Sequence, residues 1–139
     1  MQKIVIDTNV LVSSLIQRSY PYHLVVEIFS NDKIQICLSD ELFEEYVNVL
    51  KRDKFSKFPD FIANAQALLI DLEKIAVKYV PTVHLEIIKD KDDNKLLELA
   101  ETCHADFLIT GNTNDFTLSD HKGTKIVTPK KYWTDYMTE

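Results

Sequence analysis

The sequence predicts a single α/β domain over residues 1–139, with a mainly parallel central sheet of about four to five strands covered by helices. Short β-branched apolar runs recur along the chain, and segments of helical periodicity separate them, which is typical of βαβ units. No internal repeat, low-complexity run or Gly/Pro/Ser linker divides the chain. Right-handed crossovers would bring the carboxyl ends of the parallel strands to one edge of the sheet.

The strands are predicted from apolar runs that end in turn or cap signals. The first run is Ile4-Val5-Ile6, which is typical of a strand buried on both faces. Asn31-Asp32 is a turn signal before the second run, and Pro81 closes the third. The strands are expected at residues 3–7, 34–38, 77–80, 107–110 and 125–127.

The helices are predicted from apolar side chains spaced three and four residues apart. Ser39, followed by acidic residues, is typical of an N-cap and a first helical turn. Pro59 lies near the start of a later helical segment. The helices are expected at residues 10–16, 22–30, 40–52, 58–75, 93–104 and 130–137.

Composition limits the class of protein. With 45% hydrophobic residues, the chain can bury a core of its own, and Cys37 and Cys103 are interpreted as small buried residues. No signal-like N-terminus or long apolar stretch is visible, so we expect a soluble cytoplasmic protein without membrane contact. The net charge of −6 argues against a general basic nucleic-acid clamp. It leaves room for a nuclease whose carboxylates are neutralised by bound cations.

Asp7 is the most informative residue, because it directly follows the first buried strand. Open α/β sheets build their binding sites at the carboxyl ends of such strands. A carboxylate there, followed by Thr8 and Asn9, is either a helix N-cap or the first ligand of a metal site. The residues alone leave both readings open.

Other oxygen-bearing side chains are expected near Asp7. Asp93 lies at the start of a helix in an acidic run with Asp90, and not every acid of that run is needed as a cap. Glu45 falls at the margin of an apolar helix face. The strand that ends at Thr110 leads into a polar loop, residues 111–115, at the same edge of the sheet.

This donor set contains oxygen ligands and no Cys or His cluster, which favours Mg²⁺ or Mn²⁺ over Zn²⁺. Such a site suits in-line attack of activated water on a phosphodiester. The basic segment with Lys51, Arg52 and Lys54 is either a solvated helix end or a patch that contacts phosphate. Trp133 is interpreted as a packing residue, although an exposed aromatic ring there could serve RNA.

Five sequence blocks, in this order and spacing, resemble the PIN domain, in the branch that holds the toxin components of toxin–antitoxin systems. The blocks are Ile4-Val5-Ile6-Asp7-Thr8-Asn9-Val10-Leu11, residues 38–50, residues 90–100, Ala105-Asp106-Phe107-Leu108-Ile109-Thr110-Gly111-Asn112, and Ile126-Val127-Thr128-Pro129. The resemblance implies a three-layer α/β/α sandwich and a Mg²⁺- or Mn²⁺-dependent endoribonuclease. It also implies an RNA substrate, a cognate antitoxin and a homodimer.

The family's acidic quartet carries over to Asp7, Glu45 and Asp93. Many PIN domains have Asp where this chain has Asn112, so the fourth role is assigned to Asp115. Asn112 can still ligate through its carbonyl oxygen, without charge.

In the resulting hypothesis, Asp7, Asp93 and Asp115 hold the metal ion. Glu45 orients the attacking water or a second ion, and Thr110 forms a hydrogen bond with a ligand water. Supporting roles go to Asp90, Thr8, Asn9 and Asn112.

Two other functions compete. In a receiver-like phosphoacceptor domain, Asp7 would accept a phosphoryl group and would need a lysine such as Lys125 or Lys130 nearby. In a non-catalytic PIN-like binding module, Asn112 would mark a decayed site. The first alternative does not explain Glu45 or the acidic run at 90–93.

Overall fold

A computed structural model of the chain describes residues 1–112, 116 and 119–137. Its centre is a six-stranded sheet in the order β3-β2-β1-β4-β6-β5. All neighbouring strands pair in parallel except β5, which runs antiparallel to β6. The strands are β1 (Gln2–Ile6), β2 (Ile34–Leu38), β3 (Val77–Lys78), β4 (Phe107–Ile109), β5 (Asp120–His121) and β6 (Thr124–Val127).

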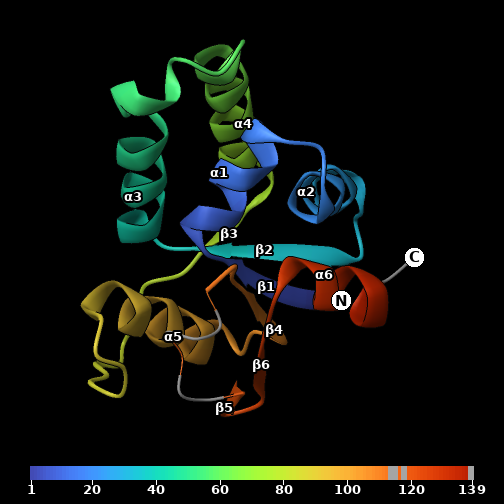
Figure 1. The fold of residues 1–139 in the computed structure, drawn as a ribbon. Coiled ribbons are helices and arrows are strands. Elements are labelled where there is room, and N and C mark those ends of the chain that lie inside the picture. Colours follow the sequence, from blue (N-terminus) through green and yellow to red (C-terminus); the bar gives the residue numbers. More distant parts are fainter. Residues whose placement is uncertain (113–115, 117–118, 138–139) are drawn as a thin grey trace.

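Helices cover both faces of this sheet (Figure 1), as the predicted sandwich requires. Figure 1 shows α1 to α4 on one side and α5 on the other, while α6 packs beside α2. The helices are α1 (Thr8–Ile16), α2 (Tyr20–Ser30), α3 (Asp40–Leu50), α4 (Phe61–Ile75), α5 (Lys91–Cys103) and α6 (Pro129–Lys131). Short helical turns at Asp53–Phe55 and Tyr132–Tyr136 complete the set.

The predicted elements are present, with shifted ends. α1 begins two residues earlier than predicted, directly after Asp7, and α4 begins three residues later, because Phe58–Asp60 forms a turn first. The two-residue strand β5 and the turn at Asp53–Phe55 were not predicted, since neither contains a periodic apolar pattern. No helix within the described residues is long and apolar enough to cross a membrane.

The sheet places its first and fourth strands side by side, which positions the residues that follow them. Ile6 pairs with Ile109, and the Asp7 amide donates to the Ile109 carbonyl at 2.9 Å. Asp7 and Thr110 therefore leave the sheet next to each other at its carboxyl edge. The chain turns from β1 toward β2 on one side, while β4 lies on the other, so this edge is a topological switch point of the kind that binds ligands in open α/β sheets.

The core fixes this edge firmly. Ile4, Val5 and Ile6 are 0%, 0% and 1% exposed, as expected for a central strand covered on both faces. Cys37 and Cys103 are buried free thiols, as predicted.

Candidate active site

The Asp7 side chain is oriented mainly by residues of the site around it. Asp7 occupies the N-cap position of α1, but its carboxylate makes no capping hydrogen bond. Instead, its Oδ2 atom accepts hydrogen bonds from the Thr110 hydroxyl at 2.8 Å and from the Asn9 amide at 3.3 Å. The side chain is therefore oriented by the site around it and is 9% exposed. Asp7 thus holds the N-cap position, while the geometric hydrogen bonds of its carboxylate come from the Thr110 hydroxyl and the Asn9 side chain.

Burial makes the Asp7 charge costly. Loss of solvent raises the pKa of its carboxyl group above the usual value, and repulsion from Glu45 raises it further. The hydrogen bond from Thr110 opposes both effects by stabilising the anion. Two carboxylates thus approach each other in a poorly solvated place, where a cation would relieve their repulsion.

Glu45 reaches this place from α3, where it is half-buried. The Thr8 hydroxyl donates a hydrogen bond to Glu45 Oε2, which links α3 to the turn that follows β1. The neighbouring Tyr46, 1% exposed, donates its hydroxyl to the carbonyl of Ile6. Both bonds hold α3 against the end of β1 and bring Glu45 toward Asp7.

Asp93 approaches from the opposite side, in the first turn of α5. Asp90 is the N-cap of this helix, and its Oδ1 accepts from the Asp92 amide at 2.8 Å. Asn94 fixes the segment before the helix, because its side chain accepts from the amides of Ile87 and Ile88 and donates to the carbonyls of Ile88 and Asp90. This buried amide sets where α5 and its acidic first turn begin.

The residues after β4 form a second network around Asp7. Thr110 is fully buried, and its hydroxyl oxygen accepts from the Asn112 amide at 3.1 Å while it donates to Asp7. Asn9 Oδ1 accepts from the Gly111 amide at 3.1 Å. The Thr110 hydroxyl thus donates directly to Asp7, a contact that the sequence-based hypothesis did not include.

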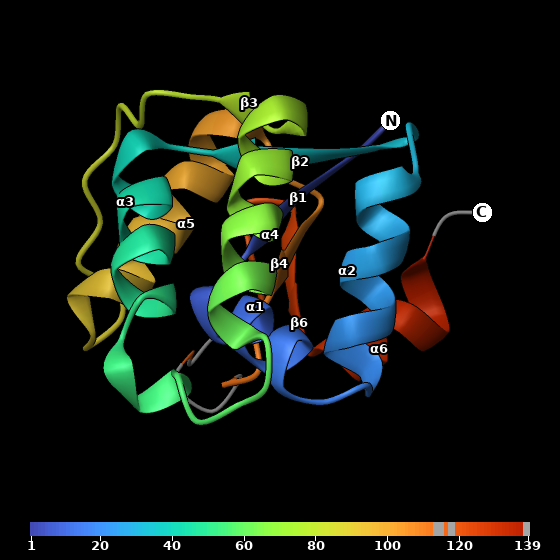
Figure 2. The same cartoon turned by 90° about the horizontal axis from the view of Figure 1, so that it is seen from above.

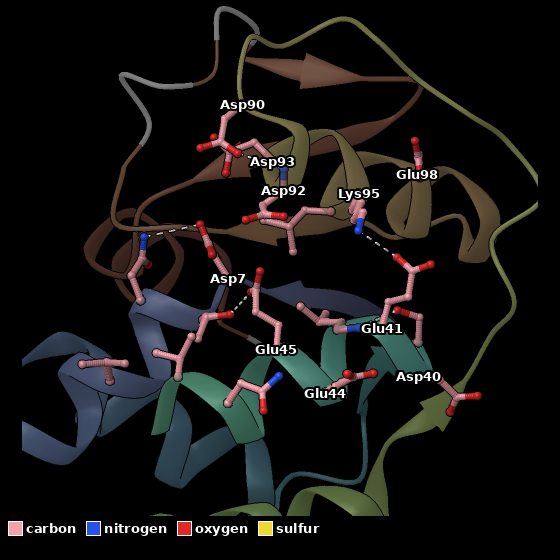
Figure 3. Close-up of a pocket in the computed structure, with 18 of the residues that line it drawn as sticks. Asp7, Asp40, Glu41, Glu44, Glu45, Asp90, Asp92, Asp93, Lys95 and Glu98 are labelled. Atoms are coloured by element: carbon pink, nitrogen blue, oxygen red, sulfur yellow. Dashed lines mark hydrogen bonds and ion pairs between the residues drawn. The ribbon is translucent and has the colours of Figure 1, made fainter. Parts of the chain in front are cut away.

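These side chains line one cavity of about 1030 Å³ (Figure 3). Figure 3 shows acidic side chains entering it from the end of β1, from α3 and from α5. Nine acidic residues and three basic residues contribute to its wall, so its charge is strongly negative. The acids are Asp7, Asp40, Glu41, Glu44, Glu45, Asp90, Asp92, Asp93 and Glu98.

The basic residues of the cavity lie at different places. Lys95 on α5 pairs with Glu41 on α3 at 3.3 Å, an ion pair that spans the cavity and raises the pKa of Lys95. Arg52 and Lys54, two of the predicted substrate-contacting residues, are also part of the wall. Lys51, the third, is exposed at the end of α3 and is not part of the wall.

A sequence profile that describes the PIN domain matches residues 3–114. The chain belongs to the PIN-domain family. It is also 25% identical to the uncharacterized protein MJ1680 of Methanocaldococcus jannaschii, over 96% of this chain and 91% of that protein. The fold is the three-layer α/β/α sandwich of PIN domains, which are generally nucleases that use divalent metal ions and act on RNA.

The structure brings most of the predicted site residues of this PIN domain together. Seven of them line the cavity: Asp7, Thr8, Asn9, Glu45, Asp90, Asp93 and Asn112. Thr110 contributes through its hydrogen bond to Asp7. Asp115 lies outside the described residues. Among residues 1–112, 116 and 119–137, no three Asp, Glu, His or Cys side chains are grouped closely enough to hold a metal ion together.

Sequence reasoning missed the residues that support this site. Asn94 carried a signal, because it is spaced three residues before Leu97 and six before Ala100 and therefore lies on the buried face of its helix. Tyr46 fits the apolar pattern of α3, but no sequence pattern indicates the hydrogen bond from its hydroxyl to the Ile6 carbonyl. The same holds for the Lys95–Glu41 pair, which joins elements that only the tertiary fold brings together.

Proposed function

We propose that this PIN domain is a Mg²⁺- or Mn²⁺-dependent endoribonuclease. The observation that supports this most directly is the convergence of Asp7, Glu45 and Asp93 on one cavity from β1, α3 and α5. These residues are far apart in the sequence, and each brings a carboxylate to the carboxyl edge of the sheet. A binding scaffold would have no need of three acids at such a place.

The donor set fits a hard divalent cation. All of the converging side chains offer oxygen, and Asp7 and Glu45 repel each other in a buried setting. Mg²⁺ commonly keeps several waters and uses one or two carboxylates together with phosphate oxygens of the substrate. The described carboxylates need not enclose the ion by themselves, and Asp115 and the Asn112 carbonyl are further candidates.

A bound cation would supply an activated water and would neutralise charge on the phosphodiester. The protein's own part is orientation. Thr110 and Asn9 fix the orientation of the Asp7 carboxylate through hydrogen bonds to its Oδ2 atom. Thr8 holds Glu45 through Oε2, so its Oε1 can accept a proton from the attacking water.

The test is cleavage of a labelled RNA in Mn²⁺. Asp7→Asn should lower the rate by roughly 100-fold or more, because its charge is lost while its shape and hydrogen bonds remain. Glu44→Gln is the matched control, since Glu44 lies on the same helix as Glu45 and is exposed at the cavity margin. A cleavage rate of Asp7→Asn equal to wild type would refute the proposal.

The fourth ligand is tested separately by Mn²⁺ calorimetry. If Asp115 binds the ion, Asp115→Ala should weaken Mn²⁺ binding far more than Asp120→Ala does. Equal effects would reject the assignment.

The non-catalytic alternative rests on Asn112, where many PIN domains carry an acid. It predicts that the wild-type chain shows no saturable Mn²⁺ binding in the same calorimeter. The phosphoacceptor alternative has less support, because Lys125 and Lys130 lie over the rings of Tyr136 and Tyr20 and neither lines the cavity of Asp7.

A toxin role in the cytoplasm, with a cognate antitoxin and a homodimeric state, forms the finer part of the proposal. Its support is the sequence resemblance described above. Expression of the chain alone should arrest growth in an Asp7-dependent manner, and a small DNA-binding protein encoded next to it should restore growth. Growth that is unaffected by wild-type expression would count against this role, and sedimentation would test the dimer.

A further inference from the structure

A second feature lies outside the acidic cavity, at the junction of α2 and α6. Aromatic and basic side chains alternate there, and we call them the basic–aromatic surface. Its members are Arg18, Tyr20, Tyr22, His23, Lys130 and Trp133. Lys130 and Trp133 lie beyond residues 3–114, the span that matches the PIN profile.

The cations of this surface lie over aromatic rings. The Arg18 guanidinium is 5.2 Å from the centre of the Tyr22 ring, and Lys130 Nζ is 5.9 Å from the centre of the Tyr20 ring. The His23 and Trp133 rings are 6.0 Å apart. These contacts hold positive charge and flat apolar area side by side, the combination that single-stranded nucleic acids require.

The surface is accessible and its charge is not neutralised. Arg18 and Lys130 are exposed, and Tyr20 is 38% exposed. Among the ion pairs of the described residues, neither Arg18 nor Lys130 takes part, whereas the adjacent Lys131 pairs with Asp135 at 2.8 Å. Tyr132 and Tyr136 pack on Phe107, and Trp133 is half-buried against the core, as predicted for a packing residue, with its ring beside His23 of α2.

The fold puts this surface on the same edge of the sheet as Asp7. The Thr110 amide donates to the Val127 carbonyl at 2.9 Å, and α6 begins two residues after Val127. The helix α2 leads back to the start of β2, so its first residues lie near the carboxyl edge. Figure 2 shows the connection between α1 and α2 on the same side of the molecule as α1, which directly follows β1, and close to α6.

Charge explains why a nuclease would need such a surface. The cavity wall carries nine acids, and a polyanion is repelled there until a cation is bound. Arg52 and Lys54 offer positive charge at the wall of the cavity, next to α3. Arg18, between α1 and α2, and Lys130, on α6, provide positive charge outside the cavity.

We propose that the basic–aromatic surface binds the single-stranded part of an RNA on one side of the scissile bond. Arg18 and Lys130 contact phosphates, while Tyr20 stacks on an unpaired base. Stacking requires bases that are free of a duplex, so the substrate class is single-stranded RNA. This inference rests on the proposed ribonuclease function.

The test is fluorescence anisotropy with a labelled single-stranded RNA of about 12 nucleotides, a length that spans both regions. Every protein carries Asp7→Asn, so that the RNA stays intact, and binding is measured in Mg²⁺ at several salt concentrations. Removing Arg18 and Lys130 together, as Arg18→Ala/Lys130→Ala, should weaken binding roughly tenfold. It should also reduce the slope of log affinity against log salt by about 1.4, since each lost phosphate contact contributes about 0.7.

The matched control is Lys33→Ala/Lys74→Ala. It removes the same charge from two exposed lysines that precede β2 and β3, at the amino edge of the sheet. Its affinity should stay within about twofold of the parent. Tyr20→Leu should lower affinity for the single strand about tenfold and leave affinity for a blunt RNA duplex unchanged.

Equal affinities of the two double variants would overturn the inference. A change in sedimenting mass of Arg18→Ala/Lys130→Ala with unchanged RNA affinity would also overturn it, because the surface would then join copies of the chain. Failure of the proposed function is recognised separately. If the wild-type protein binds RNA through this surface but does not cleave it in Mn²⁺, the proposed nuclease function is refuted, whereas RNA binding by the surface is supported.

Discussion

The hydroxyl of Tyr46 ties α3 to the end of β1, and its removal is the sharpest test of how the site is held together. Tyr46→Phe deletes one oxygen from a side chain that is 1% exposed and donates to the Ile6 carbonyl. The packing of the ring is kept. Because the carbonyl loses a buried donor, we expect the free energy of unfolding to fall by about 1–2 kcal/mol.

This cost converts into a shift in melting temperature. The unfolding entropy of a chain of 139 residues makes 1 kcal/mol equivalent to about 3 °C. Tyr46→Phe should therefore melt about 3–7 °C below wild type by calorimetry, with the same difference in free energy from urea unfolding. RNA cleavage should also decline, since Glu45 is the neighbour of Tyr46 on α3.

Tyr136→Phe is the matched control. Tyr136 is half-buried and packs on Phe107, but none of the hydrogen bonds found in the described part of the chain involves its hydroxyl. Its melting temperature should stay within about 1 °C of wild type. If Tyr46→Phe were as stable as this control, the bond to Ile6 would contribute nothing and the account of α3 would be wrong.

Three further predictions concern stability. Without divalent cations, the contribution of Asp7 to stability should decrease as pH rises from about 4, because its raised pKa lets the native state bind more protons than the unfolded state there. The pH curve of Asp7→Asn in urea titrations should lack this contribution. Asn94→Ala should cost about 2–4 kcal/mol in the same assay, because the amide and carbonyl of buried Ile88 and the amide of Ile87 lose their side-chain partner. Ser39→Ala should cost about 1 kcal/mol, since the Leu42 amide loses its cap at 3.1 Å.

Each of these has a contradicting result. Parallel pH curves for wild type and Asp7→Asn would show that Asp7 carries no shifted proton. An Asn94→Ala variant within about 0.5 kcal/mol of wild type would show that water replaces the amide. Ser39→Gly, which should cost only a few tenths of a kcal/mol, serves as the reference for the cap.

The sequence was sufficient to predict the main strands and helices, and it named acids that the fold brings to the wall of one cavity. The strand at Ile4 to Ile6 and the helix cap at Ser39 could be predicted, because apolar runs and capping motifs involve residues that are close together in the sequence. The hydrogen bond that orients the buried Asp7 carboxylate could not be predicted from the sequence. It comes from Thr110, which lies beside Asp7 only because β1 pairs with β4.

The remainder was unpredictable for a physical reason. The bonds from Thr8 to Glu45 and from Tyr46 to Ile6 require the crossing position of α3 over β1, which no periodicity encodes. Likewise, the contact of Lys130 with Tyr20 joins residues far apart in the sequence. Such pairs follow from tertiary packing, while the patterns read from sequence report on one element at a time.

The surplus of acids around the cavity makes cation and RNA linked ligands. By thermodynamic reciprocity, a divalent cation that binds in the cavity and raises RNA affinity has its own affinity raised by RNA by the same factor. Sodium and magnesium should therefore act in opposite directions on RNA binding at low millimolar Mg²⁺, where sodium only screens. For this protein, the free divalent concentration would set both the number of RNA molecules bound and the readiness of each to react.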